Sequence, residues 1–255
     1  MEKIKHIGGS LLVLAILWQS LALAGGWNEA LFPSPWGTLK GLGELLSEGV
    51  LATDIGASLG RFFLGYVSAV VLAMALGLVL GWSRSLWNYI NPLAQVLRPV
   101  SPVAWLPFIV LFFGIGEMPA LVIIFIAAFF PVLLATVSAV QEMEPVYLKV
   151  ARNFGIGQPE ILGKIVFPAV FPRIATGLHL ALGTAWVFLV AGEMAGAQSG
   201  LGFLIIDARN NLRADWLMAA ILTIGVLGLL LDGGVRLLEG RIYRLWGLKK
   251  RSGVS

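Results

Sequence analysis

Six stretches of the chain are apolar for long enough to cross a lipid bilayer as helices. They cover residues 7–24, 62–82, 93–113, 119–140, 168–191 and 216–231. A hydrocarbon core about 30 Å thick requires about 20 apolar residues of helix. The pattern therefore predicts an all-α integral membrane protein, with residues 1–255 forming a single transmembrane domain of about six spans.

Three prolines interrupt the third stretch: Pro99, Pro102 and Pro107. Each removes a backbone hydrogen bond, which in lipid has to be replaced by neighbouring protein. We therefore expect this stretch to be buried within the helix bundle. In the second stretch, Gly77 and Gly81 form a pair of small residues four apart, which permits close approach of another helix.

The first stretch has an alternative interpretation as a signal peptide. Lys3 and Lys5 precede an apolar run that ends in Ala22-Leu23-Ala24, a small-residue pattern of the kind that signal peptidases cleave. The run is long for a signal peptide, which favours a retained span. Both interpretations leave residue 26 outside and the later topology unchanged.

Composition supports the membrane assignment. Apolar residues make up 58% of the chain and charged residues 13%, with mean hydropathy +0.88. In soluble domains about 45–50% of the residues are apolar and about 25% are charged. The chain has no cysteine and only two histidines, His6 and His179. This excludes a disulfide scaffold and a cysteine-ligated metal site, and we expect no metal site.

The distribution of basic residues predicts the orientation. With the N-terminus inside, the cytoplasmic side carries 14 of the 18 basic residues, among them the run from Arg241 to Arg251. The outer side carries four, which are Lys40, Arg61, Arg209 and Arg213. The positive-inside rule therefore places both termini in the cytoplasm. Basic residues at the inner leaflet also explain the net charge of +4 without a nucleic-acid partner.

Two parts of the outer side have patterns of their own. After the turn at Pro33-Ser34-Pro35, leucines recur at helical spacing from Leu39 to Leu46, which predicts an amphipathic helix lying over the outer face. Arg209 and Arg213 are four residues apart, and either meet an acidic patch of a binding protein or are simply solvated.

A charged segment, residues 141–167, joins the fourth and fifth stretches. Pro145 suits the first turn of a helix, Gly155 and Gly157 suit its end, and Pro159 suits the start of a second helix that runs to Pro168. Long loops with their own helices are usually functional. The pattern predicts a helix–turn–helix that projects into the cytosol, and the alternative is an interfacial hairpin that only reverses the chain.

This segment resembles the signature loop of the membrane-spanning subunits of bacterial binding-protein-dependent ABC importers. That signature is Glu-Ala-Ala, three residues, Gly, nine residues, Ile, one residue and Leu-Pro. Lys149-Val150-Ala151, Gly155, Ile165 and Phe167-Pro168 have the same spacing. The departures are Lys149 for Glu, Val150 for the first Ala and Phe167 for Leu. In the family this loop is the coupling helix, seated in a groove of the ATPase subunit. The resemblance implies ATPase-coupling roles for Pro145, Tyr147, Lys149, Ala151, Gly155, Ile165 and Pro168.

Other parts of the chain are similar to the nitrate/sulfonate/taurine branch of that family. They are Leu31–Pro35, Ser58–Arg61, Leu97–Pro107 and Ser199–Gly202. The resemblance implies import of a small, anionic solute such as nitrate, taurine or another sulfonate, or bicarbonate, across the bacterial inner membrane by alternating access. Relatives of this branch also carry thiamine-precursor pyrimidines, and that heterocyclic cargo stays an alternative.

The resemblance also implies the partners. These are two ATPase subunits that bind ATP and magnesium, a second permease copy in a homodimer, and a periplasmic or lipid-anchored substrate-binding protein. The chain itself has no phosphate-binding loop, since Gly163-Lys164 is followed by Ile165. We therefore expect it to bind no cofactor and to have no ATPase activity of its own.

Polar residues inside the spans are candidates for the translocation path, because they are costly in lipid and tend to face a cavity. Most polar residues of the fifth stretch fall within one arc of about 100° around the helix. Residues of the third stretch are added as further candidates. The candidates are Arg98, Ser101, Trp105, Thr176, His179, Gly183, Trp186 and Glu193. We interpret His179 as a donor toward an anion, Trp186 as a steric gate and Glu193 as a cap or gate contact. The alternatives are that His179 packs between helices and that Arg98 reaches to the interface.

Two other functions compete with this interpretation. A membrane enzyme is disfavoured because the chain lacks paired intramembrane carboxylates, a histidine cluster and a nucleophile–base pair, so no catalytic residue is expected. A stand-alone secondary transporter stays open, since six spans with Gly and Pro breaks permit it. Six helices are few for a complete pathway, which favours a dimer.

Overall fold

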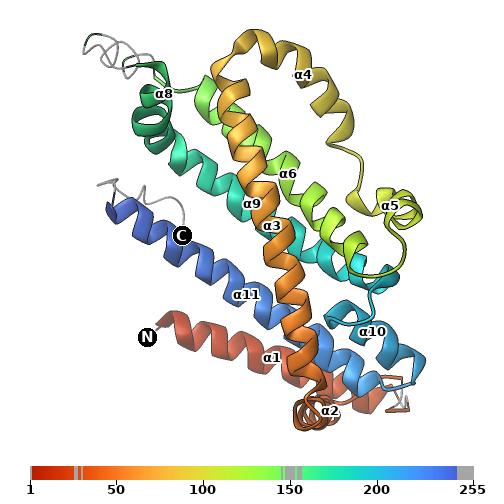
Figure 1. Cartoon of the computed structure of the whole chain (residues 1–255). Coiled ribbons are helices and arrows are strands. Elements are labelled where there is room, and N and C mark those ends of the chain that lie inside the picture. The colour runs from red at the N-terminus through yellow and green to blue at the C-terminus, as the bar shows by residue number, and fades with distance from the viewer. Residues whose placement is uncertain are drawn as a thin grey trace.

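The structure is a computed structural model that describes residues 2–25, 28, 29, 31–144, 146, 153 and 157–245. All regular elements in these ranges are helical (Figure 1). In chain order they are α1 (Glu2–Ala24), α2 (Pro35–Ser47), α3 (Val50–Trp82), α4 (Arg84–Leu97), the 3₁₀-helix η1 (Pro102–Trp105), α5 (Leu106–Phe113), α6 (Glu117–Gln141), α8 (Gln158–Ile161), the π-helical turn η2 (Leu162–Val166), α9 (Phe167–Gly196), α10 (Leu201–Asn210) and α11 (Ala214–Leu245). The predicted all-α class is confirmed.

The centre of the molecule is a packed trio of long helices, α3, α6 and α9 (Figure 1). Small residues let these helices approach closely. A Cβ added to Gly77 would lie 2.6 Å from the Thr136 Cβ, and one added to Gly81 would lie 2.7 Å from the Val140 Cβ. The two glycines of α3 therefore make the close helix contact that their spacing predicts.

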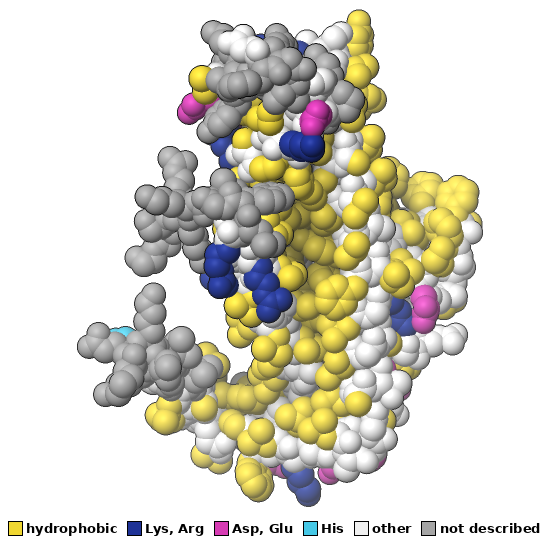
Figure 2. Space-filling view, turned by 60° about the vertical axis from the view of Figure 1, so that its left-hand side comes forward, with side chains coloured by type: hydrophobic (Ala, Val, Ile, Leu, Met, Phe, Trp, Pro, Cys, Tyr) yellow, Lys and Arg dark blue, Asp and Glu magenta, His cyan; other side chains and the backbone are white. Residues whose placement is uncertain are grey.

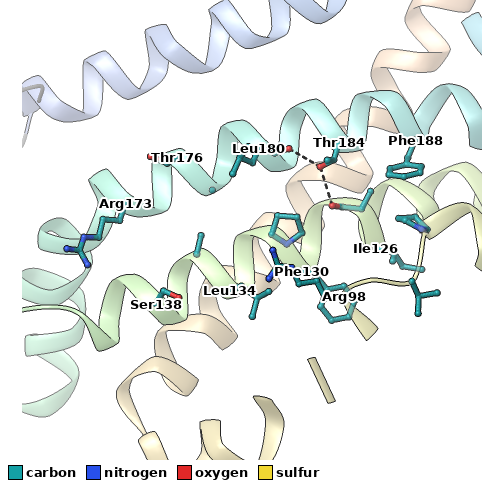
Figure 3. A pocket seen from close by; sticks show the side chains of 16 residues that line it. Arg98, Ile126, Phe130, Leu134, Ser138, Arg173, Thr176, Leu180, Thr184 and Phe188 are labelled. Atoms are coloured by element: carbon teal, nitrogen blue, oxygen red, sulfur yellow. Dashed lines mark hydrogen bonds between the residues drawn. The ribbon is translucent and has the colours of Figure 1, made fainter. Parts of the chain in front are cut away.

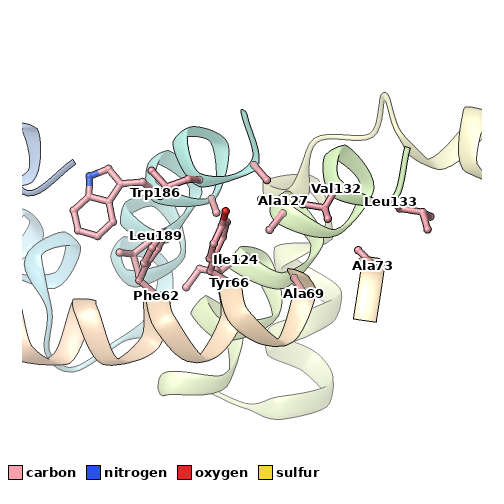
Figure 4. Packing of buried hydrophobic residues seen from close by; sticks show 14 of the residues in the cluster. Phe62, Tyr66, Ala69, Ala73, Ile124, Ala127, Val132, Leu133, Trp186 and Leu189 are labelled. Carbon is pink, nitrogen blue, oxygen red and sulfur yellow. The ribbon is translucent and has the colours of Figure 1, made fainter. Parts of the chain in front are cut away.

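The core of this trio is apolar and partly aromatic. Phe62 and Tyr66 of α3 stack with ring centroids 5.3 Å apart, and Trp186 of α9 meets Phe62 edge-on at 5.3 Å (Figure 4). Ile124 of α6 and Leu189 of α9 complete the contact. Since these side chains come from all three helices, the core fixes their relative positions.

Within the described residues, four helical segments are long and apolar enough to cross a membrane: Val50–Trp82, Glu117–Gln141, Gly163–Gly196 and Ala214–Arg244. A fifth candidate is the broken pair of α4 with η1 and α5, whose two parts are bent by 85°. The apolar part of α1, Leu12–Ala24, is shorter than these. Six spans therefore stay a prediction.

The third apolar stretch is not buried within the bundle, and this expectation is wrong for the single chain. Its three prolines do interrupt it, and after the bend α5 contacts α6 and α9 with one side only. Leu111 and Phe112 are 83% and 82% exposed, and Ile109 is the buried member of α5. The stretch therefore lies along one side of α6 and leaves an apolar surface uncovered.

Helix α2 confirms the amphipathic helix predicted after Pro33. The Ser34 hydroxyl caps its first turn by accepting from the Gly37 N–H at 3.0 Å. Leu45 is buried against α10 and α11, whereas Leu39 and Leu46 are exposed. We call this end of the molecule, where α2 and α10 lie, the α10 end, and the opposite end, where α8 lies, the loop end (Figure 1).

Residues 158–168, the second half of the charged segment and the start of the fifth stretch, are helical, as the prolines predict. Helix α8 continues through η2 directly into α9, with Pro168 in the first turn of α9. Lys164 Nζ lies 2.5 Å from Glu160 Oε1, one helical turn earlier. The start of the fifth stretch is therefore a continuous helix that enters the bundle from the loop end.

Candidate functional site

A cavity of about 560 Å³ lies between α6, α9 and the junction of α4 with η1 (Figure 3). Helix α6 contributes the wall from Ile126 to Ser138, and α9 contributes the wall from Arg173 to Phe188. Figure 3 shows Arg173 toward one end, Phe188 toward the other and Arg98 between them, beside Phe130 and Leu134.

The charged groups that line this cavity are both cations, Arg98 and Arg173. Arg173 Nη1 donates to Glu142 Oε2 at 2.6 Å, which partly neutralises it. Arg98 makes no side-chain hydrogen bond or ion pair within the described part of the chain. The cavity therefore holds one free guanidinium and one that a carboxylate balances.

Pro131 in the middle of α6 adds a backbone acceptor to the wall. Because proline has no N–H, the Ala127 carbonyl one turn earlier loses its helical donor. The Thr184 hydroxyl of α9 lies 3.5 Å from that oxygen, and it also donates to the Leu180 carbonyl at 2.8 Å. Figure 3 shows both contacts as dashed lines.

The structure brings two of the predicted path residues, Arg98 and Thr176, to this cavity. The others do not line it: Ser101, Trp105, His179, Gly183, Trp186 and Glu193. The side of α9 that does so is one helical face running from Arg173 through Leu180 and Thr184 to Phe188. Thr176 belongs both to this cavity face and to the arc of polar residues predicted for the fifth stretch. Most other residues of that arc face α3 and α11 instead.

His179 lies between α9 and α11. Its Nδ1 is 3.0 Å from Asp232 Oδ1, and its Nε2 is 2.9 Å from Glu239 Oε1. Arg236 in turn contacts the second oxygen of Asp232 at 2.8 Å. Both ring nitrogens therefore face carboxylates of α11. This arrangement corresponds to the alternative in which His179 packs between helices.

Trp186 is buried in the core shown in Figure 4. Its indole Nε1 donates to the Ile224 carbonyl of α11 at 3.1 Å, and its ring lies against Gly228. The side chain thus anchors α11 to the trio of α3, α6 and α9.

Glu193 lies in a buried polar cluster at the α10 end. Arg61 Nη1 donates to Glu193 Oε1 at 2.8 Å, and the Ser58 hydroxyl lies 2.9 Å from both carboxylate oxygens. The Gly202 N–H donates to Glu193 Oε2 at 2.9 Å, and the Gly200 N–H donates to Asp54 at 2.8 Å. The carboxylate therefore caps the first turn of α10.

Arg213 is also held in place at the α10 end. It contacts Glu44 of α2 and donates to Asp215 Oδ2 at 2.7 Å, and its guanidinium lies 4.3 Å from the Trp216 ring centroid. Arg209 is exposed. Of these two arginines, Arg209 is thus the more accessible to a partner.

Most of the predicted coupling residues lie outside the described residues: Pro145, Tyr147, Lys149, Ala151 and Gly155. Ile165 lies in η2 and packs beside Val166 and Val170, and Pro168 begins α9. These two positions join the segment to the end of the bundle.

A comparison with protein families gives the assignment. The model of the family described as "Binding-protein-dependent transport system inner membrane component" matches residues 73–244, more than half of the chain. The chain belongs to this family. Curated relatives named as ABC transporter permeases are similar to it over most of their length.

Three relatives show the extent of that similarity. The permease is 35% identical over 242 residues to a putative ABC transporter permease protein of Methanocaldococcus jannaschii, covering 91% of this chain and 88% of the relative. It is 31% identical over 239 residues to the taurine transport system permease protein of Escherichia coli, covering 92% and 87%. It is 33% identical over 239 residues to a nitrate import permease protein of Synechocystis, covering 90% and 86%.

Solved structures support the fold. A chain of the MetNI methionine ABC transporter in an inward-facing conformation superposes with TM-score 0.64 at 18% identity, covering 77% of this permease and 96% of that chain. A second crystal form of the same transporter gives TM-score 0.62.

Three polar residues that line the cavity are not among the candidates predicted from the sequence. Arg173 is one of the 14 basic residues assigned above to the cytoplasmic side, and its position on the cavity face of α9 places it in the wall. Thr184 lies outside the arc chosen for α9, and Ser138 ends the wall on α6. The proline at position 131 was a usable signal, because a proline within a span exposes a carbonyl that neighbouring polar groups approach.

Proposed function

We propose that this permease passes a small oxyanion across the bacterial inner membrane along the cavity between α6 and α9. The observation that carries the proposal is the charge of the cavity wall, in which Arg98 and Arg173 stand without a lining carboxylate. Cations inside a membrane protein are costly and mark ion or substrate paths. A guanidinium suits oxyanions because it donates two parallel hydrogen bonds to two of their oxygens.

The depth of Arg98 supports a role in translocation. It lies beside Phe130, close to the middle of α6, which runs from Glu117 to Gln141. A positive charge at that depth lowers the barrier that the low-dielectric core presents to an anion. Arg173 lies nearer the loop end, where Glu142 shares its charge.

The names of the relatives are consistent with this charge. Nitrate, taurine and the aliphatic sulfonates named for the relatives each carry a singly charged group of three oxygens. We propose that the cargo belongs to this class. A binding protein would deliver it at the α10 end.

The energy for transport is proposed to come from separate ATPase subunits that bind ATP and magnesium. The segment 141–167 would dock on them, with Tyr147 and Ala151 on one helical face of the docking segment and Gly155 at its end. The loop end would then be cytoplasmic, with both termini on that side, as the distribution of basic residues supports.

A second copy of the permease would complete the path. The exposed apolar side chains of α5, including Leu111 and Phe112, are uncovered in the single chain and support a homodimer.

The test is uptake by proteoliposomes that contain the permease, its ATPase and its binding protein. Labelled nitrate, taurine and an alkyl sulfonate are offered with internal ATP or with ADP. ATP-dependent uptake of at least one of these anions is expected, and an uncharged heterocycle should not compete. Uptake that persists without ATP would overturn the importer mechanism in favour of a secondary transporter.

A further inference from the structure

An apolar groove of about 360 Å³ lies between α3 and α11, on a different side of the molecule from the cavity with the two arginines. Phe62, Phe63 and Tyr66 of α3 form one wall, and the stretch Leu230–Arg241 of α11 forms the other. Figure 2 shows a hollowed hydrophobic face with basic side chains grouped beside it. Both flanking helices are candidate membrane spans, so the groove opens toward lipid.

Among the described residues that line the groove, Arg241 is the one with a charge. It makes no side-chain hydrogen bond or ion pair with any residue in the described ranges. The nearby carboxylates of α11 have other partners, since Asp232 contacts His179 and Arg236, and Glu239 contacts His179. An uncompensated guanidinium therefore stands at one end of an otherwise apolar groove.

The length of the groove matches one leaflet of a bilayer. The helix rises about 16 Å over the eleven steps from Leu230 to Arg241, at about 1.5 Å per residue. Half of a hydrocarbon core is about 15 Å. A groove that starts near mid-membrane and ends at a cation near the loop end fits a lipid whose acyl chain lies along α11 and whose phosphate meets Arg241.

We propose that this groove binds one phospholipid with an anionic headgroup, as a structural ligand that fills the space between α3 and α11. Apolar side chains at its rim, among them Leu230 and Leu238, are exposed in the single chain and would be covered by the acyl chain. The guanidinium selects the headgroup, because an anionic lipid carries charge beyond that of a zwitterionic one.

Gly234 provides a sharp test. It lines the groove, and a Cβ added there meets no atom within 4 Å, so a leucine can be introduced there without a clash at its Cβ and would take up space in the groove. Gly225 is the matched control, because it lies on the same helix, also has open space at its Cβ and is not part of the groove.

The experiment measures lipid retained by the intact transporter complex. Complexes with wild-type, Gly234→Leu, Gly225→Leu and Arg241→Gln permease are purified from nanodiscs of equal phosphatidylglycerol and phosphatidylcholine, and analysed by native mass spectrometry. We expect one phosphatidylglycerol per wild-type or Gly225→Leu permease and a loss of at least fivefold in Gly234→Leu. Arg241→Gln should retain lipid with equal preference for the two headgroups.

Two results would overturn the proposal. One is equal retention in Gly234→Leu and Gly225→Leu, and the other is an unchanged headgroup preference in Arg241→Gln. A second permease copy is the rival occupant. Because the chain has no cysteine, Gly234→Cys introduces a single thiol, and efficient disulfide dimerisation through it in the nanodisc would show that protein covers the groove.

Discussion

Arg61 of α3 and Glu193 of α9 form a buried ion pair, with Arg61 Nη1 2.8 Å from Glu193 Oε1 and side-chain exposures of 4% and 0%. The pair joins two spans that are 132 residues apart in the chain. Arg61 also donates to the Ser199 carbonyl at 2.8 Å, so it holds the turn before α10 as well. The cluster fixes the α10 end of the bundle, where a binding protein is proposed to deliver the cargo.

Breaking this pair should destabilise the permease strongly. Arg61→Met leaves the Glu193 carboxylate buried without its cation, which costs about 3–5 kcal/mol in comparable buried pairs. The double variant Arg61→Met, Glu193→Gln should lose less stability than the sum of the two single variants. Thermal unfolding in detergent measures this, with Lys164→Ala as a control in an exposed pair, where about 0–1 kcal/mol is expected. Additive losses would show that the two side chains are not coupled.

Gly200 should not tolerate a side chain. Its φ is +103°, and an added Cβ would lie 2.3 Å from Glu193 Oε1. Gly200→Ala combines backbone strain with a clash against the buried carboxylate, so we expect a lower unfolding temperature and poor recovery from membranes. Gly43→Ala in α2, where the added Cβ has open space, is the control and should keep wild-type recovery. Equal recovery of both variants would contradict the buried arrangement.

The contact between α2 and α11 should weaken in acid. The hydrogen bond from Arg213, and then that from Trp216, hold the pKa of Glu44 below its usual value. A carboxyl with a lowered folded pKa contributes stability above its unfolded pKa and loses it as the pH falls through the folded pKa. The unfolding temperature of wild type should therefore exceed that of Glu44→Gln at pH 7 and approach it as the pH falls below about 4.5. A difference that stays constant over this range would contradict the role of Glu44.

The segment 141–167 should determine ATPase binding. A tagged permease solubilised from its native host is expected to recover an ATPase chain, identified by mass spectrometry. Gly155→Asp places a charge at the glycine of the signature and should abolish this recovery. Gly43→Asp, in α2 at the α10 end, should leave it unchanged. Recovery of the ATPase with Gly155→Asp would show that docking lies elsewhere.

The sequence predicted much of the fold, because long apolar runs and capping residues act locally. The spans at α3, α6, α9 and α11, the amphipathic helix α2 and the close contact at Gly77 and Gly81 all follow from neighbouring residues. The prolines of the third stretch marked a break, but its direction depends on how α6 packs against α5. That direction is a tertiary property, and the expected burial was wrong.

The candidate site was harder to predict, since it depends on which face of α9 meets which helix. Helical spacing alone grouped His179, Trp186 and Glu193 correctly on one side but could not show that α3 and α11 cover that side. Both Ser58–Arg61 and Ser199–Gly202 were visible as family segments. That the two segments contact each other around Glu193 could be seen only in the folded structure.

The most direct test of the central claim is ATP-dependent uptake of the transported anion by proteoliposomes with Arg98→Gln permease. Arg84→Gln, an exposed arginine of α4 outside the cavity, is the matched control. A charged hydrogen bond is worth about 1.5–3 kcal/mol, so uptake by Arg98→Gln should fall at least about tenfold while ATPase binding stays normal. Arg84→Gln should transport like wild type. Wild-type uptake by a normally assembled Arg98→Gln complex would contradict an anion path through this cavity.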